Sequence, residues 1–134
     1  MLAVVWRRPA VLLVVAAADG LADGLASLIK LSNHERRPAL RFPEPPALVS
    51  LPHSSSFPSG HAATSFACAT VLSVLAPRLA PAFVVLACAI AYSRVYVGVH
   101  YPFDVVAGAV LGVVVGLVAV ALLRRAGRRY ARLR

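Results

Sequence analysis

Four stretches of this 134-residue chain are apolar enough and long enough to cross a lipid bilayer as helices. They cover residues 9–31, 59–76, 82–99 and 102–123. A hydrocarbon core about 30 Å thick needs about 20 apolar residues of helix, and the middle two stretches, about 18 residues each, suit a slightly thinner bilayer. The pattern therefore predicts an all-α integral membrane helical bundle of about four transmembrane helices. It would form one domain over residues 1–134, with an outward-facing loop between the first two spans and a basic cytoplasmic tail at 124–134.

The composition separates this chain from three other classes of protein. Hydrophobic residues make up 60% and charged residues 14% of the sequence, whereas an ordinary soluble domain has about 45–50% and about 25%. The high apolar share also excludes intrinsic disorder, which needs low hydrophobicity. The net charge of +9 would suit a nucleic-acid binder, but such proteins spread their basic residues over a polar face. The long apolar stretches leave no such face, so we expect a membrane environment and no nucleic-acid partner.

The basic residues are distributed unevenly between the two sides of such a bundle. With four crossings, nine of them fall on the side of the two termini and five on the other side. The nine are Arg7, Arg8, Arg78, Arg124, Arg125, Arg128, Arg129, Arg132 and Arg134. Because cytoplasmic loops carry an excess of lysine and arginine, both termini are expected in the cytoplasm. The chain would then be a multi-pass protein of the cell (plasma) membrane, with the loop 32–57 at its outer face.

Small residues recur at four-residue spacing in the first and fourth stretches. One row is Ala16, Gly20 and Gly24, and the other is Gly108, Gly112 and Gly116. Such rows let helix backbones approach closely in lipid. Chance spacing in a chain this rich in glycine and alanine is an equally good interpretation.

Polar residues at the outward ends of the four spans are expected to converge on one surface. They are Lys30, Arg37, Ser59, Gly60, His61, Arg94, His100 and Asp104. One cation at a span end is most simply a side chain that reaches the headgroups, but three cations with two histidines indicate a binding site. Three cations suit an anion with several oxygens, because the arginine fork matches phosphate. Ser59 is a natural N-cap, and the free N–H groups of Gly60 and His61 would point at the anion.

The two histidines and the carboxylate supply the groups needed for phosphoryl transfer. Asp104 follows His100 by four residues. One helical turn therefore places the carboxylate beside the ring, where it fixes the tautomer and raises its nucleophilicity. His61 comes from another span and can act as a general acid on the leaving oxygen. These groups and the cations together predict phosphoryl transfer through a phosphohistidine.

Three motifs of the chain resemble the signature of a known enzyme family. Lys30 and Arg37-Pro38 read K-x6-R-P, residues 58–61 read P-S-G-H, and residues 93–104 read S-R-x5-H-x3-D. In this order and at this spacing they resemble the type 2 phosphatidic acid phosphatase family (lipid phosphate phosphatases), over a little more than half of the chain. Typical bacterial members resemble six-span bundles with two spans before the lysine motif. This chain has one such span, so it is similar to a minimal four-span bacterial member.

The resemblance implies a role for each matched residue. His100 is expected to be the nucleophile, Asp104 the carboxylate that orients it and His61 the general acid. The implied phosphate-binding residues are Lys30, Arg37, Ser59, Gly60 and Arg94. The resemblance implies no metal and no other cofactor. A homodimer would replace the packing surface of the missing helices, and a monomeric mass in mild detergent would count against that hypothesis.

The expected function is metal-independent hydrolysis of a terminal phosphate or diphosphate of a membrane lipid. Polyprenyl phosphate or diphosphate, phosphatidylglycerol phosphate and phosphatidic acid all fit, and the sequence does not choose among them. One alternative is a non-catalytic membrane protein that binds lipid phosphate. Another is an enzyme similar to the vanadate-dependent haloperoxidases, although those resemble larger soluble proteins.

Two carboxylates in the first stretch, Asp19 and Asp23, belong to none of the motifs. Carboxylates inside a membrane are costly and are usually paired or functional. Structural pairing is the simpler interpretation, and a substrate or proton role is the alternative. His34 and His53 also match no motif, and we expect them to be solvated loop residues.

Overall fold

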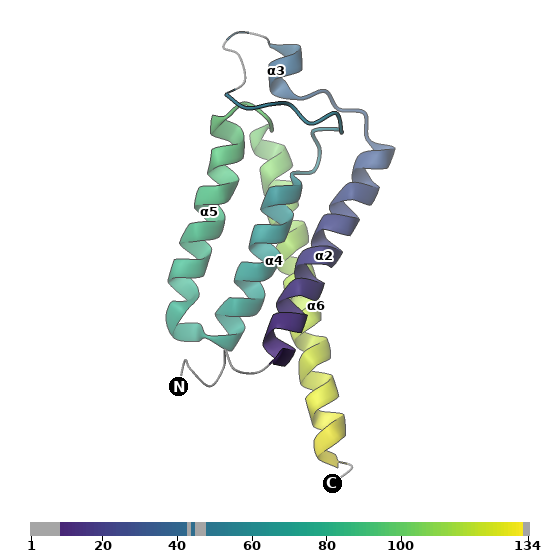
Figure 1. The fold of residues 1–134 in the computed structure, drawn as a ribbon, viewed down its shortest axis with the longest axis vertical. Coiled ribbons are helices and arrows are strands. Elements are labelled where there is room, and N and C mark those ends of the chain that lie inside the picture. Colours follow the sequence, from purple (N-terminus) through teal and green to yellow (C-terminus); the bar gives the residue numbers. More distant parts are fainter. Residues whose placement is uncertain (1–8, 43, 45–47, 133–134) are drawn as a thin grey trace.

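The computed structural model describes residues 9–42, 44 and 48–132, and every regular element within them is helical (Figure 1). The all-α class expected from the sequence is confirmed. Arg7, Arg8 and Arg134, which carry part of the orientation argument, lie outside the described residues. In chain order the elements are α2 (Pro9–Ser32), α3 (Pro38–Arg41), α4 (Gly60–Leu75), the short 3-10 helix η1 (Pro77–Leu79), α5 (Ala80–Tyr96) and α6 (Pro102–Arg132).

Three helical segments are long and apolar enough to cross a membrane. They are Val11–Ser32, Pro77–Tyr96 and Pro102–Ala126. The 16-residue α4 is shorter and lies at the centre of the bundle, where it packs against α2, α5 and α6 (Figure 1). Large apolar side chains such as Leu13 and Val85 are exposed on the surrounding helices, as expected for helices in contact with lipid. The protein is therefore an integral membrane helical bundle.

The helix α6 is longer than the fourth apolar stretch of the sequence. Its 31 residues correspond to about 46 Å of helix, and its C-terminal end extends beyond the other helices (Figure 1). The segment 124–132, expected to be a basic tail, is a continuation of this helix.

A row of glycines brings α6 against the backbone of α4. A Cβ atom added to Gly108 would collide with the carbonyl oxygen of Ser59, and one added to Gly112 would collide with that of Ala63. Gly116 is equally close to α4. The packing interpretation of the glycine row is therefore confirmed for α6.

The corresponding row on α2 does not pack against another helix. No atom lies within 4 Å of a Cβ added to Gly20 or Gly24, and Ala16 is exposed. Within the described residues of this chain, the packing interpretation is therefore not supported for this row. The packed face of α2 consists instead of three fully buried alanines, Ala18, Ala22 and Ala26.

The long loop between α2 and α4 lies over the end of the bundle where α2 and α5 end and α4 and α6 begin (Figure 1). Two backbone hydrogen bonds join it to the helices beneath: Leu48 N donates to Val97 O at 3.3 Å, and Ser59 N donates to Asp104 O at 2.9 Å. The loop contains the short helix α3, which begins directly after Arg37. All the sequence motifs therefore meet at this end of the molecule.

Candidate active site

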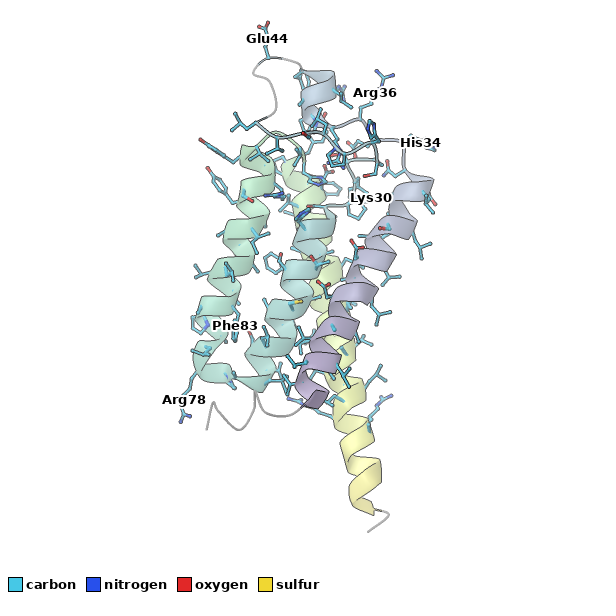
Figure 2. The ribbon with its side chains drawn as sticks, in the orientation of Figure 1. Lys30, His34, Arg36, Glu44, Arg78 and Phe83 are labelled. Carbon is cyan, nitrogen blue, oxygen red and sulfur yellow. The ribbon has the colours of Figure 1, made fainter. Side chains whose placement is uncertain are left out.

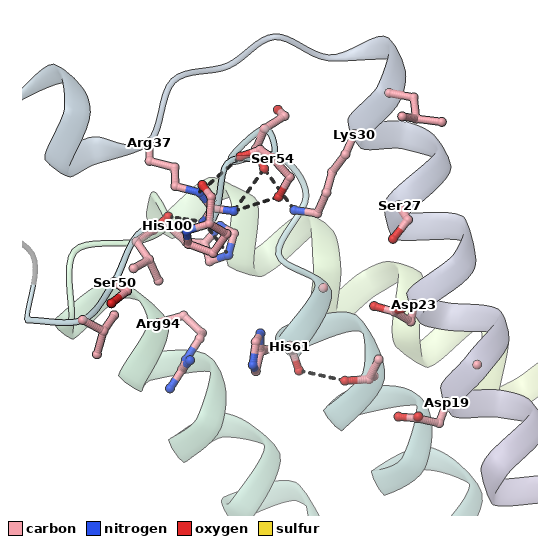
Figure 3. Close-up of a pocket in the computed structure, with 18 residues that line it drawn as sticks. Asp19, Asp23, Ser27, Lys30, Arg37, Ser50, Ser54, His61, Arg94 and His100 are labelled. Carbon is pink, nitrogen blue, oxygen red and sulfur yellow. Dashed lines mark hydrogen bonds between the residues drawn. The ribbon is translucent and has the colours of Figure 1, made fainter.

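A cleft of about 990 Å³ opens beneath the loop and is lined by residues of α2, α4, α5 and the α5–α6 junction. Six of the eight site residues expected from the sequence line it: Lys30, Arg37, Gly60, His61, Arg94 and His100. The other two, Ser59 and Asp104, are buried behind its wall, with 0% and 1% of their surfaces exposed. Lys30, His61 and Arg94 point into the same space from three different helices (Figure 3). The fold therefore brings together groups that are up to 74 positions apart in the chain.

Arg37 is almost completely buried and holds the loop in place over the cleft. Its Nε donates to the carbonyl oxygen of Pro52 at 3.1 Å, and its Nη2 donates to Ser54 Oγ at 3.2 Å. Its Nη1 donates to the carbonyl oxygen of Val99 at 2.9 Å and lies 3.4 Å from His100 Nε2. The planar fork of arginine allows one cation to reach all these partners, so Arg37 joins the loop to the α5–α6 junction.

Two further cations lie on either side of the cleft. Lys30 Nζ, in the last turn of α2, donates to the carbonyl oxygen of Ser55 at 3.1 Å. Arg94, in the last turn of α5, donates from Nε to Ser93 Oγ at 3.1 Å. Three positive side chains thus approach one cavity, an arrangement that suits a ligand with several anionic oxygens.

The N-terminus of α4 faces the cleft. Ser59 has an extended backbone, and its Oγ accepts from Ala62 N at 3.4 Å, which confirms it as the N-cap. Gly60 and His61 form the first turn and line the cleft, and His61 is exposed to it. Helix N-termini attract anions through their free N–H groups and the helix dipole.

His100 is contacted on both ring nitrogens. Its Nδ1 lies 3.5 Å from Asp104 Oδ2, close to the carboxylate but without a formed hydrogen bond, and its Nε2 lies 3.4 Å from Arg37 Nη1. A guanidinium can only donate, so Nε2 must carry a lone pair and Nδ1 the proton. Gly98, two residues earlier, turns the chain at this point with a φ of 77°, a conformation that glycine accepts without steric cost.

The surroundings of His100 keep its ring uncharged. Burial, followed by the positive charges of Arg37 and Lys30, lowers the pKa of His100 to about 4, and the carboxylate of Asp104 opposes this shift only in part. The imidazole is therefore neutral near pH 7. A neutral ring whose unprotonated Nε2 lies beside Arg37, in a cleft with two further cations, has the properties of a nucleophile toward phosphorus once bound phosphate takes over the contact with Arg37.

The carboxylate of Asp104 is held by two donors. Its Oδ2 accepts from Ser56 Oγ at 2.5 Å and from Tyr101 N at 2.8 Å. Ser56 is fully buried and was not among the residues expected from the sequence. The only signal for it was its place in the run Ser54–Ser56, shortly before the P-S-G-H motif.

Asp19 and Asp23 line the part of the cleft farthest from the loop (Figure 3). Cys68 Sγ donates a long hydrogen bond of 3.7 Å to Asp19 Oδ1, which agrees with the structural pairing expected for Asp19. Asp23 instead faces the cleft. His34 and His53 are exposed, as expected. Among the described residues, no three His, Cys, Asp or Glu side chains gather in a way that would hold a metal ion.

Comparison with known proteins places these residues in a family. The chain matches the PAP2 superfamily over residues 9–128. It is 41% identical over 115 residues to the decaprenylphosphoryl-5-phosphoribose phosphatase of Mycobacterium tuberculosis. That alignment covers 84% of this chain and 61% of the relative, so the chain spans less than two thirds of that protein.

Two solved structures have the same fold. The crystal structure of Aquifex aeolicus LpxE matches with a TM-score of 0.78 and 33% identity, over 86% of this chain and 70% of that one. The first transmembrane PAP2 type phosphatidylglycerolphosphate phosphatase from Bacillus subtilis matches with a TM-score of 0.67 and 27% identity, over 84% of this chain and 59% of that one. With the family match covering nearly all of the helical bundle, the chain belongs to the PAP2 superfamily.

Proposed function

We propose that this protein hydrolyses the terminal phosphate of a membrane lipid through a covalent phosphohistidine at His100. The observation that carries the proposal is the orientation of His100, whose neutral ring directs the Nε2 lone pair away from Asp104 and toward Arg37 at the cleft. The names of the similar proteins support the same class of reaction.

The first half of the proposed reaction transfers the phosphoryl group to the enzyme. Lys30, Arg37 and Arg94 bind the non-bridging oxygens and spread their negative charge. His100 Nε2 attacks phosphorus, so a P–N bond forms as the P–O bond to the lipid breaks. His61, which lines the same cleft from the first turn of α4, donates a proton to the departing oxygen. The phosphorylated ring becomes cationic, and the carboxylate of Asp104 stabilises that charge.

The second half returns the enzyme to its starting state. His61, now neutral, accepts a proton from a water molecule whose oxygen attacks phosphorus. The P–N bond breaks, orthophosphate leaves, and His100 is again neutral with its proton on Nδ1. No metal is needed in this scheme because the three side-chain cations supply the positive charge, and we expect activity to persist in EDTA.

For the substrate, we propose a phosphomonoester carried by a long-chain lipid. The cleft runs along one membrane-spanning helix, since it extends from Lys30 to Asp19 on α2, and Arg94 of α5 also lines it. A lipid is thus able to reach it from the side. The name of the mycobacterial relative points to a phosphorylated sugar on a polyprenyl carrier as the first compound to test.

Phosphate release by the purified protein tests the proposal. The panel comprises polyprenyl-linked sugar phosphates, polyprenyl mono- and diphosphates, phosphatidylglycerol phosphate and phosphatidic acid. We expect release from at least one of them, a loss of about 100-fold or more in His61→Ala, and background activity in His100→Ala. Arg78→Ala, at the opposite end of the bundle, is the control and should keep full activity. Unchanged turnover in His100→Ala would refute the mechanism, and binding of these lipids without phosphate release would favour a non-catalytic binder.

We further propose that the cleft faces the outer side of the cell membrane, with both termini in the cytoplasm. Glu44 and Arg78 lie at opposite ends of the bundle (Figure 2) and are both exposed. In a chain whose Cys68 and Cys88 are replaced by alanine, Glu44→Cys should react with an impermeant maleimide on intact cells. Arg78→Cys should react only after permeabilisation, and the reverse pattern would invert the orientation.

A further inference from the structure

One buried hydroxyl outside the three motifs contacts the carboxylate next to the proposed nucleophile. Ser56 is 0% exposed, and its Oγ donates to Asp104 Oδ2 at 2.5 Å. This distance is at the short end of the range for a hydroxyl bonded to an ionised carboxylate. Ser56 lies behind the wall of the cleft and not among the residues that line it, so its hydroxyl reaches Asp104 and not a bound substrate.

All the contacts that orient the Asp104 side chain fall on one of its two oxygens. Oδ2 accepts from Ser56 Oγ and from Tyr101 N, and the same atom lies 3.5 Å from His100 Nδ1. Oδ1 is buried and has no hydrogen-bond partner among the described residues. The rotation of the carboxylate is therefore fixed by the hydrogen bonds that Oδ2 accepts.

The position of Ser56 is itself fixed by the loop. Its backbone N donates to the carbonyl oxygen of Glu35 at 3.0 Å. Three residues further on, Ser59 N donates to the carbonyl oxygen of Asp104 at 2.9 Å. These two hydrogen bonds fix the backbone from Ser56 to Ser59. This segment therefore holds the Ser56 hydroxyl against the first turn of α6.

We propose that Ser56 is a positioning residue for the phosphohistidine reaction. Its hydroxyl holds Asp104 Oδ2 toward His100 Nδ1, which keeps the ring in the tautomer whose Nε2 is free to attack. Without this hydroxyl the carboxylate retains the Tyr101 N–H as its only donor besides the His100 ring, and the reactive tautomer is less favoured. The inference rests on the proposed function and predicts a defect in the chemical step, with substrate binding unaffected.

A double-mutant cycle between Ser56 and Asp104 tests this role. In the otherwise unchanged protein, Ser56→Ala should lower kcat roughly tenfold to a hundredfold and change KM by less than about twofold, because a hydrogen bond to a charged group is lost. In the Asp104→Ala background, the same change should alter kcat by less than about twofold, since no carboxylate remains to be held. Ser73→Ala is the matched control, because the Ser73 hydroxyl is also buried but has no partner among the described residues.

A second substitution keeps the test available if Ser56→Ala does not fold. Ser56→Cys retains the shape of the side chain but is a weak donor, and its kcat should fall between those of serine and alanine. A wild-type kcat in either variant would overturn the inference, and so would an equal loss in both Asp104 backgrounds, which marks a purely structural role. Full turnover in His100→Ala would instead remove the proposed function itself, whereas an inactive His100→Ala beside a fully active Ser56→Ala would remove only this inference.

Discussion

The two sides of α4 differ in how closely they pack against the neighbouring helices. The side that faces α6 is closed, because the glycines of α6 rest against the α4 backbone. The side that faces α2 and α5 opens, at the end covered by the loop between α2 and α4, into the cleft lined by His61, Lys30 and Arg94. In the proposed function these two sides have different roles: the closed side fixes the nucleophile through Asp104, and the open side admits the substrate.

The position of each histidine follows this division. Asp104 lies in the first turn of α6, is buried, and belongs to the closed side, where Ser59 N bonds to its backbone carbonyl. His100, two residues before α6, is also buried but lines the edge of the cleft. His61 is exposed on the open side. A nucleophile needs a fixed geometry. A group that donates a proton to the leaving lipid and later accepts one from water must instead be accessible to both the lipid and water.

The largest effect is expected from filling the closed side. Gly112→Ala places a Cβ atom against the carbonyl oxygen of Ala63, and because this obstacle is backbone, the two helices must separate. We expect a loss of about 1–3 kcal/mol or more of stability, with a parallel loss of activity. The measurement is thermal unfolding in detergent, combined with phosphate release.

Gly24→Ala is the matched control on α2, where no atom lies within 4 Å of the added Cβ. Alanine is the better helix former, so the melting temperature should be unchanged or slightly higher. Equal destabilisation by the two substitutions would mean that the α4–α6 contact is no tighter than the open face of α2.

A smaller effect should appear in the pH dependence of kcat/KM. As the pH falls through the pKa of His100, the ring gains a proton and the nucleophile is lost. Because that pKa is lowered to about 4, His100 should remain active well below the usual histidine value of about 6.5. In Arg37→Gln, one of the charges that lower the pKa is absent, so the acid limb should move to higher pH.

The substrate phosphate titrates in the same way with the unchanged protein and with Arg37→Gln. Comparing the two on the same lipid therefore isolates the contribution of His100. The overall rate of Arg37→Gln will also fall, because Arg37 binds phosphate in the proposed scheme, and only the position of the limb is informative. An acid limb that stays in place or moves to lower pH would contradict the account of His100.

The sequence predicted the helical class, and it predicted that the candidate site residues lie at one end of the bundle, because both depend on spacing along one helix or one span. Apolar length defines membrane-spanning segments, and alternating crossings bring Lys30, His61 and His100 to one end. The two small-residue rows were indistinguishable in the sequence, because the face of a helix that packs depends on its neighbours in space. Ser56 was missed for the same reason: its partner, Asp104, is 48 positions away and lies in another helix.

A covalent bond between phosphorus and His100 is the central step of the proposed reaction. Trapping that bond tests the reaction most directly. The protein is mixed with lipid carrying a radioactive terminal phosphate and quenched in alkali within one turnover, and His61→Ala and His100→Ala are treated in the same way. We predict acid-labile, alkali-stable label on His100 in the unchanged protein, the same label formed more slowly in His61→Ala, and none in His100→Ala. Sustained phosphate release with no labelled protein at any time would contradict the mechanism.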